Sequence, residues 1–293
     1  MSCAHEGLGS PSPDSTELSQ QPLTGCTGYI NAGGRGTRLS SIFHPHERRG
    51  VSKALLPIGN PPISLLEHHV NKLVSAGVPM IVAGVGDHEN VAAYMESTYK
   101  AGNVQPIHYA EQLGNGGDLV RAVRDHPKLF ADDILIVNVD TLLDINEAKF
   151  LAFHRENGGE LSIALTKNRG VPNEDAYYVG AGGEILYSAE ATTNNMSAEV
   201  ALGSCSYRGS STGALIASRE AISMVDWQPE DGELSIYRDI VASAIGRKAM
   251  FGFNIGKGLF IDVGTVDTWH ETQEKHAMIA PYIHYANNTC VNL

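Results

Sequence analysis

Paired cysteines and long apolar runs are both missing from this sequence. Its four cysteines show no CxxC pair and no regular spacing. This pattern argues against a disulfide framework and against a Cys-rich zinc site, and it favours reduced thiols in the cytoplasm. No apolar run reaches the length that a bilayer requires, and the N-terminus lacks the basic and apolar regions of a signal peptide. We therefore expect no membrane partner.

Positive charge is also scarce. The chain has 21 Lys and Arg against 33 Asp and Glu, which gives a formal net charge of -12. Nucleic-acid binding depends on neutralising many phosphates, so we expect no nucleic-acid partner. A small phosphorylated ligand is still compatible with this composition, because it needs only a few local cations and backbone N–H groups.

The chain is long enough for a substantial core, with 293 residues of which 42% are hydrophobic. Residues 1–24 are rich in Ser, Pro, Gly and Gln, which predicts a disordered leader. We expect a single domain over residues 25–293. Its first half, about 25–145, would bind a nucleotide, and its second half, about 146–293, would complete the cleft.

Strand and helix patterns alternate after the leader. Strands are expected over residues 28–30, 79–85, 106–109, 133–139 and 161–165. Helices are expected over residues 65–76, 89–100, 118–125, 147–157 and 233–245. This order predicts an α/β fold with a mainly parallel, Rossmann-like sheet flanked by helices. Ligands of such sheets bind at the carboxyl ends of the strands.

A glycine-rich loop follows the first expected strand. Gly33, Gly34 and Gly36 allow close approach of a ligand to the backbone, and Arg35 and Arg38 add positive charge. The loop is neither a Walker A motif nor a GxGxxG motif. Taken alone, it predicts an anion site or an ordinary turn that carries two arginines.

A second motif, GVSKALLPIG at residues 50–59, changes this balance. Together the two motifs resemble the N-terminal signature of sugar-1-phosphate nucleotidyltransferases, which runs AGGxGTRL, then PK or SK, then Leu-Pro. Further segments resemble the same family in the same order. They are Glu111–Gly117 (an LGTAGA-type loop), Asn138–Asp140 (Gly-Asp), Ser211–Ala214 (Asn-Ala-Gly) and Asp262–Thr265 (Asp-Ile-Gly-Thr). The similarity spans about residues 27–275 and implies a GT-A-like nucleotidyltransferase fold.

The reaction that this resemblance implies joins two anions. A phosphate oxygen of a sugar-1-phosphate attacks the α-phosphorus of a nucleoside triphosphate, and pyrophosphate leaves. Arg38, Lys53 and Asp140 are the implied catalytic residues. Arg38 and Lys53 are implied to hold the triphosphate. Asp140 and Asp262 are implied to hold Mg²⁺, a cation that prefers oxygen ligands. Each of these residues also has a plainer interpretation. Asp140 would be a helix cap, Asp262 a turn residue and Lys53 a solvated surface lysine.

The resemblance also assigns the two substrates to residues. The nucleotide is implied to contact Asn31, Ala32, Gly33, Gly34, Arg35, Gly36, Thr37, Gln112 and Gly114. The sugar phosphate is implied to contact Glu190, Thr212 and Gly213.

The chain departs from the family pattern at two positions. Val139 replaces the glycine that precedes the metal-binding aspartate, which would crowd the backbone there. Ala191 replaces the lysine of a Glu-Lys-Pro segment that binds the sugar phosphate. Either another cation takes its place, with Arg208, Arg219 and Lys257 as the candidates, or the acceptor differs from the common hexose phosphates. We expect a substitute cation.

The segments after Asp140 are most similar to the mannose- or heptose-phosphate guanylyltransferases, which favours GTP and suggests a heptose or octose phosphate. Residues 50–53 are more similar to the thymidylyltransferases, so a thymidylyl- or uridylyltransferase is an alternative. A GT-A glycosyltransferase usually has Asp-x-Asp, whereas Asn138 stands two positions before Asp140. An inactive regulatory homologue is the remaining alternative. The resemblance implies a homodimer or homotetramer.

Overall fold

The computed structural model describes residues 23–34, 36–39, 52–167, 176–191, 194, 196–256 and 258–283. The strands are β1 (Cys26–Asn31), β2 (Pro57–Ile58), β3 (Ile63–Ser64), β4 (Met80–Gly86), β5 (Val104–His108), β6 (Asp133–Asn138), β7 (Thr141–Leu143), β8 (Leu161–Lys167), β9 (Ala176–Val179), β10 (Ile185–Ser188), β11 (Tyr207–Ser218), β12 (Met250–Asn254) and β13 (Phe260–Asp262). The α-helices are α1 (Leu65–Ser75), α2 (Glu89–Thr98), α3 (Gly114–Asp125), α4 (Glu147–Asn157), α5 (Ala198–Ser204), α6 (Arg219–Ser223), α7 (Val241–Gly246), α8 (Val266–Glu274) and α9 (His276–Ile279).

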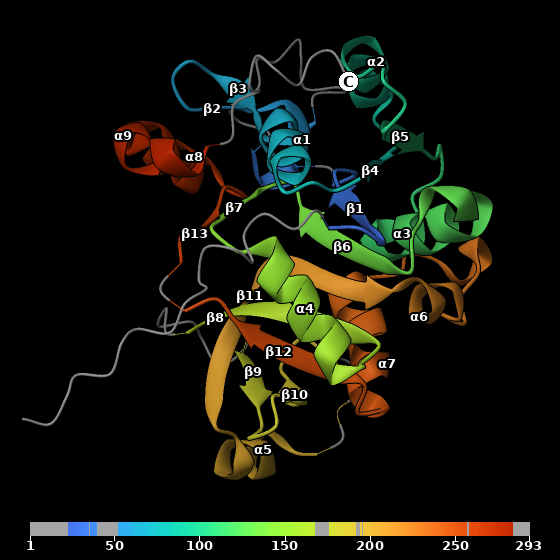
Figure 1. The fold of residues 1–293 in the computed structure, drawn as a ribbon, viewed down its shortest axis with the longest axis vertical. Coiled ribbons are helices and arrows are strands. Elements are labelled where there is room, and N and C mark those ends of the chain that lie inside the picture. The colour runs from blue at the N-terminus through green and yellow to red at the C-terminus, as the bar shows by residue number, and fades with distance from the viewer. Residues whose placement is uncertain are drawn as a thin grey trace, which may run out of the picture.

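One nine-stranded sheet contains strands from both halves of the chain (Figure 1). Its main path runs β10-β9-β11-β6-β1-β4-β5, and β8 pairs with both β11 and β12. The pairs β6–β1, β1–β4 and β4–β5 are parallel, as expected from the βαβα order. β11 then adds antiparallel pairs with β6, β8 and β9. The expected α/β fold is confirmed.

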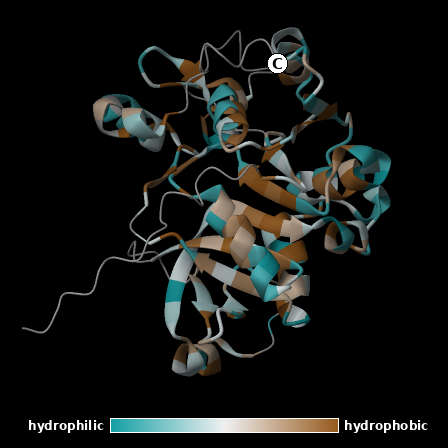
Figure 2. Cartoon of the chain, in the orientation of Figure 1, coloured by the Kyte–Doolittle hydropathy of each residue, from teal (hydrophilic) through white to brown (hydrophobic). Residues whose placement is uncertain are grey.

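Helices cover both faces of the sheet, because alternate residues of its strands point to opposite sides. On β1, Ile30 packs with the apolar residues of α1, α2 and α4, whereas Tyr29 packs with those of α3, α6 and α7. Both side chains are fully buried. Figure 2 shows the resulting pattern, with hydrophobic residues in the central strands and hydrophilic ones on the outer surfaces of the helices.

Helix ends follow local signals in the sequence. Ser64 and Glu67 form a capping box at the start of α1, in which the Glu67 N–H donates to Ser64 Oγ at 3.1 Å. Gly158, with φ of 61°, ends α4. Both helices begin at the residue that the periodicity predicts, because their apolar spacing and their caps agree.

Two expected helices differ from the structure. α3 begins at Gly114 rather than residue 118, because its glycines are packing positions: a Cβ on Gly114 would lie 2.5 Å from the Leu234 carbonyl oxygen. The helix expected over 233–245 begins later, with the π-helical turn η7 (Ile236–Ile240) followed by α7. The preceding residues bond to α3 instead, since the Leu234 N–H donates to the Leu113 carbonyl at 2.9 Å.

Within the described ranges, no helix is both long and apolar enough to cross a membrane. Most of the expected leader, residues 1–22, lies outside those ranges.

Candidate active site

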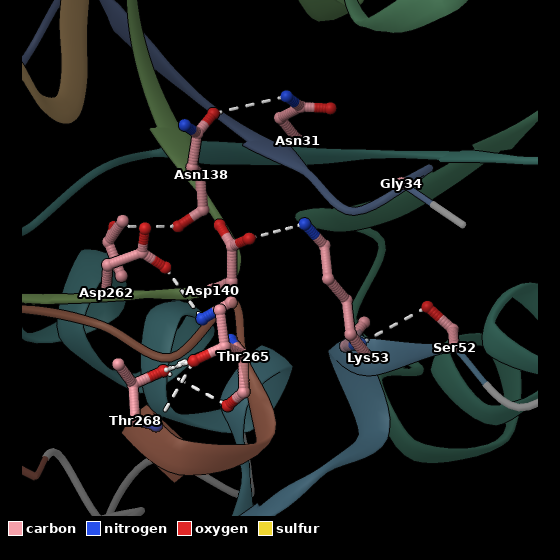
Figure 3. Close-up of polar contacts among 12 residues, drawn as sticks. Asn31, Gly34, Ser52, Lys53, Asn138, Asp140, Asp262, Thr265 and Thr268 are labelled. Carbon is pink, nitrogen blue, oxygen red and sulfur yellow. Dashed lines mark hydrogen bonds and ion pairs between the residues drawn. The ribbon is translucent and has the colours of Figure 1, made fainter. Parts of the chain in front are cut away.

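Lys53 and Asp140 meet beyond the carboxyl end of β6. Lys53 Nζ lies 2.5 Å from Asp140 Oδ2, and the two side chains are only 16% and 11% exposed. Lys53 begins the short helix η3 (Lys53–Leu55), which Ser52 caps by accepting the Ala54 N–H at 3.2 Å. Figure 3 shows the lysine reaching from this cap toward the aspartate. A buried pair this close excludes the plainer interpretation of Lys53 as a solvated surface lysine.

Asp262 lies next to Asp140 because two short strands pair. β13 and β7 form an antiparallel ladder that places Asp262 opposite Thr141, and the Val263 N–H donates to the Asp140 carbonyl at 2.7 Å. The Gly264 N–H donates to Asp262 Oδ1 at 2.6 Å and holds the carboxylate in place (Figure 3). Two acids that are far apart in the sequence thus share one site.

The charges of this site influence each other. Burial raises the pKa of Asp262, and the negative charge of Asp140 raises it further. The Gly264 N–H, Arg38 and Lys53 oppose this rise in pKa. Arg38 reaches the site because position 264 has no side chain: a Cβ there would lie 3.1 Å from Arg38 Nη2.

The two carboxylates fit the Mg²⁺ that the family implies. Mg²⁺ commonly takes one or two protein carboxylates and completes its octahedron with water and substrate phosphates. No group of three or more His, Cys, Asp or Glu side chains with metal-binding geometry occurs among the described residues. Asp140 already faces one cation, Lys53, so this position favours positive charge. The site therefore suits a metal that is shared with a phosphorylated substrate.

The glycine loop packs against the Lys53 side chain. A Cβ on Gly34 would lie 3.0 Å from Lys53 Cε, and one on Gly36, whose φ is 59°, would lie 3.3 Å from Lys53 Cβ. Ala32 is fully buried, and its N–H donates to the Gly84 carbonyl at 2.9 Å. Larger side chains at the two glycines would displace the lysine. Of the other predicted loop residues, Arg35 and the Thr37 side chain lie outside the described part.

A cavity of about 250 Å³ opens beside this loop. Four of the predicted nucleotide residues, Gly33, Gly34, Gln112 and Gly114, line it together. Asp118 of α3 also lines it, and sequence reasoning did not select this residue. Its side chain is only 6% exposed, and burial raises its pKa to about 7. The only sequence signal was its place directly after the glycines of the LGTAGA-type loop.

The residues expected on the sugar side differ in how they are placed. Gly213 has φ of 77°, and a Cβ there would lie 2.9 Å from Cγ2 of Thr141, the residue after Asp140. Thr212 is fully buried and its hydroxyl donates to the Ala164 carbonyl at 3.0 Å, so this hydroxyl is engaged within the sheet. Glu190 is exposed and accepts a hydrogen bond from the Tyr177 hydroxyl at 3.2 Å.

A chain of polar side chains connects the two halves of the site. Asn31 Nδ2 donates to Asn138 Oδ1 at 3.2 Å, and Asn138 Nδ2 donates to the Tyr237 hydroxyl at 3.2 Å (Figure 3 shows the first of these bonds). The charges of Glu190 and Asp140 both help to raise the pKa of Tyr237, after burial. Sequence reasoning missed Tyr237, since nothing local relates it to Asn138.

The structure narrows the choice of a substitute for the missing lysine at Ala191. Arg219 pairs with Asp132 at 3.3 Å, at the amino end of β6 and away from the site, so this candidate is wrong. Arg208 stays a candidate, and its guanidinium carbon lies 5.9 Å from the centroid of the Tyr178 ring. Lys257 lies outside the described residues.

Val139 does not crowd the site as expected. Its side chain is fully buried in the core cluster that packs against α1 and α4, and its N–H donates to the Asn31 carbonyl at 3.2 Å. Val139 thus contributes to the core, whereas the Asp140 side chain contacts Lys53.

Two named relatives are similar in sequence to most of this chain. A mannose-1-phosphate guanyltransferase of Debaryomyces hansenii is 27% identical over 244 residues, which cover 81% of this chain and 60% of that enzyme. A D-glycero-alpha-D-manno-heptose 1-phosphate guanylyltransferase of Aneurinibacillus thermoaerophilus is 24% identical and covers 84% and 96%. The chain thus spans about 60% of the length of the fungal relative.

Solved structures share the fold. A putative glucose-1-phosphate thymidylyltransferase from Bacillus anthracis superposes with a TM-score of 0.65 at 17% identity, covering 86% of this chain and 95% of that one. HddC from Yersinia pseudotuberculosis, complexed with GMP-PN, superposes with a TM-score of 0.60 at 21% identity, covering 85% and 98%.

The model of one family matches residues 28–238. This range includes the glycine loop, Lys53, Asp140 and all the residues that line the cavity. Together with the fold, this match over most of the chain places the protein: it belongs to the MobA-like NTP transferase domain family.

Proposed function

We propose that the chain is a sugar-1-phosphate guanylyltransferase, which makes a GDP-sugar and pyrophosphate from GTP and a mannose- or heptose-type sugar-1-phosphate. The observation that carries this proposal is the meeting of Arg38, Lys53, Asp140 and Asp262 beside the glycine loop. The names of two relatives, a mannose-1-phosphate and a heptose-1-phosphate guanylyltransferase, support the base and the substrate class.

The reaction is a displacement at the α-phosphorus. A phosphate oxygen of the sugar-1-phosphate forms the new P–O bond, and the bond between the α-phosphorus and the bridging oxygen of pyrophosphate breaks. The attacking oxygen is already ionised, so the protein needs to supply little base catalysis. Its main tasks are to orient two anions and to cancel their repulsion.

Each charged residue of the site has a part in this scheme. Lys53 exchanges its contact with Asp140 for a contact with the triphosphate, and Arg38 supports the pyrophosphate that leaves. Asp140 and Asp262 would hold Mg²⁺, whose charge stabilises the negative charge on the phosphates. On the other side, Glu190 and the backbone around Gly213 would orient the sugar phosphate.

Three further points belong to the same proposal. The chain is proposed to act in the cytoplasm, which the unpaired spacing of the cysteines in its sequence favours. The family resemblance supports a homodimer or homotetramer, which light scattering of the purified chain would test. Residues 25–293 are proposed to act as one domain, since strands from both halves share one sheet.

The test is a matrix of GTP, ATP, CTP, UTP and dTTP against mannose-, heptose- and glucose-1-phosphate, with pyrophosphate detection and mass spectrometry of the product. We expect GTP with a mannose or heptose phosphate to give pyrophosphate and the GDP-sugar. The test variant is Asp140→Asn, which changes the site. Its matched control is Asp132→Asn, which changes a 90% exposed acid at the other end of β6.

Two results would contradict the proposal. One is the absence of pyrophosphate for every pair of substrates in the presence of Mg²⁺, which would favour an inactive homologue. The other is transfer of the sugar from a nucleotide sugar without release of pyrophosphate, which would favour a glycosyltransferase.

A further inference from the structure

Asp118 is a buried acid that the proposed chemistry does not use. It lies on α3, and 94% of its surface is buried since only 6% is exposed. Its Oδ1 atom has no hydrogen-bond partner among the residues that the structure describes. An unpaired carboxyl group in such a place is costly, so its presence calls for a ligand or a partner.

The other oxygen of Asp118 lies at the wall of the cavity beside the glycine loop. A Cβ on Gly33 would lie 2.9 Å from Asp118 Oδ2, and one on Gly86 would lie 3.6 Å from it. Gly33 and Gly86 line the same cavity as Asp118. The two glycines also touch each other, since a Cβ on Gly33 would lie 2.9 Å from the Gly86 nitrogen. Only residues without side chains leave room for the Asp118 carboxylate at this wall of the cavity.

The rest of the cavity wall has the same charge. Asp87, Glu111 and Glu233 also line it, and none of its described lining residues is a lysine or an arginine. Such a wall does not suit a phosphate group. It suits a ligand portion that presents several N–H donors, because an ionised carboxylate can only accept hydrogen bonds. The triphosphate belongs instead with Lys53 and Arg38, on the other side of the glycine loop.

From this placement we infer that Asp118 reads the guanine base, by accepting hydrogen bonds from the N1–H and the 2-amino group. This inference rests on the guanylyl transfer proposed above and adds the residue that selects the base. Aligned with the LGTAGA pattern, Asp118 stands at the final alanine, which has no side chain able to accept these bonds.

Guanine is the common base whose pairing edge suits a carboxylate. It presents two adjacent donors, the N1–H and the 2-amino group. Uracil and thymine present a single N–H between two carbonyl acceptors, which a carboxylate repels. Adenine and cytosine present an amino group next to a ring nitrogen that is itself an acceptor. Asp118 thus favours guanine over the other four bases, because its carboxylate attracts N–H donors and repels acceptors on the edge of the base.

The test measures nucleotide binding to the full chain by titration calorimetry, with Mg²⁺ and without a sugar phosphate. The probes are GTP, ITP, which lacks the 2-amino group, and XTP, which has a carbonyl in its place. The native chain should bind GTP about 10–100-fold more tightly than ITP, because one hydrogen bond to a charged group is lost. UTP and dTTP should bind more weakly still.

The variant Asp118→Asn replaces one hydrogen-bond acceptor of the side chain with a donor. Its amide oxygen can accept the N1–H of xanthine and its amide N–H can donate to the 2-carbonyl, so XTP should now bind more tightly than GTP. The matched control is Asp125→Asn, an exposed acid on the same helix whose Oδ2 pairs with Arg121 at 3.3 Å. This control should keep the GTP to ITP ratio of the native chain.

Equal binding of GTP and ITP to the native chain overturns the inference, whatever the variants do. So does a native GTP to ITP ratio that persists in Asp118→Asn. If GTP still gives pyrophosphate with a sugar-1-phosphate in those cases, the proposed function stands without this role for Asp118. Binding of dTTP in preference to GTP overturns both.

Discussion

Lys53 Nζ and Asp140 Oδ2 are 2.5 Å apart, and the two side chains are only 16% and 11% exposed. The lysine compensates a pair of neighbouring acids, since the charge of Asp140 also raises the pKa of Asp262. A triphosphate that enters the site competes with Asp140 for the same cation. The ion pair therefore keeps the acids compensated until the substrate and its metal arrive.

We expect Lys53→Met to lower kcat/KM by about 100- to 1000-fold, the usual loss when one preorganised cation or donor is removed from a developing anion. It should also lower the free energy of unfolding by about 1–3 kcal/mol, because Asp140 is left buried without its partner. Steady-state pyrophosphate release and urea unfolding measure the two effects.

The control for this change is Lys128→Met, which alters an exposed lysine of the short helix η4 (Pro127–Leu129). It should leave both quantities within error. The double variant Lys53→Met with Asp140→Asn should unfold more easily than the native chain by less than the sum of the two single changes, because the two residues interact. Strict additivity would contradict the ion pair.

Removal of metal gives a second prediction. EDTA should abolish pyrophosphate release and excess Mg²⁺ should restore it. Asp262→Asn should raise the Mg²⁺ concentration for half-maximal rate by about 10-fold or more, since one of two carboxylate ligands is lost. The exposed Asp132→Asn should not. A rate that does not depend on Mg²⁺ would remove the metal role of Asp140 and Asp262.

Gly213 offers a test of the sugar side. Gly213→Ala places a methyl group 2.9 Å from Thr141 Cγ2 in a backbone with φ of 77°. We expect a loss of about 2–4 kcal/mol in unfolding free energy, from backbone strain and from the clash together. The KM for the sugar phosphate should also rise, because the clash displaces the loop after β6.

Gly102→Ala separates these two causes. Gly102 has a similar φ of 82°, but nothing lies within 4 Å of the position of its Cβ. Its replacement should cost only the backbone strain, about 1 kcal/mol, and should leave the KM unchanged. Equal losses for the two variants would mean that the contact with Thr141 carries no energy.

The sequence predicted well the elements whose signals are local. β1, β4, β6 and α4 lie where their apolar periodicity places them, and the motif around Lys53 is contiguous in the chain. The glycines of α3 predicted a loop, because intrinsic propensity says nothing about the tight packing of Gly114 against Leu234. Tertiary contact decided the structure there.

Residues of the site fall into the same two groups. Lys53 and Asp262 could be selected because each lies in a short pattern that resembles a family motif. Their meeting with Asp140 could not be calculated from the sequence, since it depends on the β7–β13 ladder. Tyr237 lies outside the motifs, and Asp118 stands where the LGTAGA pattern has an alanine, so only the structure shows what surrounds them.

The pKa of Asp118 gives a prediction for stability against pH. Burial first, and then the negative charge of Asp87, raise this pKa from 3.8 to about 7, although Arg121 opposes the rise. Between about pH 4 and 7 the folded chain therefore binds one more proton than the unfolded chain does. By linkage, the contribution of this group to stability falls as pH rises through that window.

Asp118→Asn removes this dependence while it keeps the shape of the side chain. The variant should gain stability over the native chain by roughly 2–3 kcal/mol between pH 5 and pH 8, as each unit of pKa shift corresponds to about 1.4 kcal/mol. Urea unfolding of both chains at the two pH values measures the difference, and other acids cancel in the comparison. A difference that is the same at both pH values would mean that Asp118 is ionised throughout in the folded chain. Saturating GTP should reduce the difference at pH 8, because the guanine donors stabilise the ionised carboxylate of the native chain and not the neutral amide.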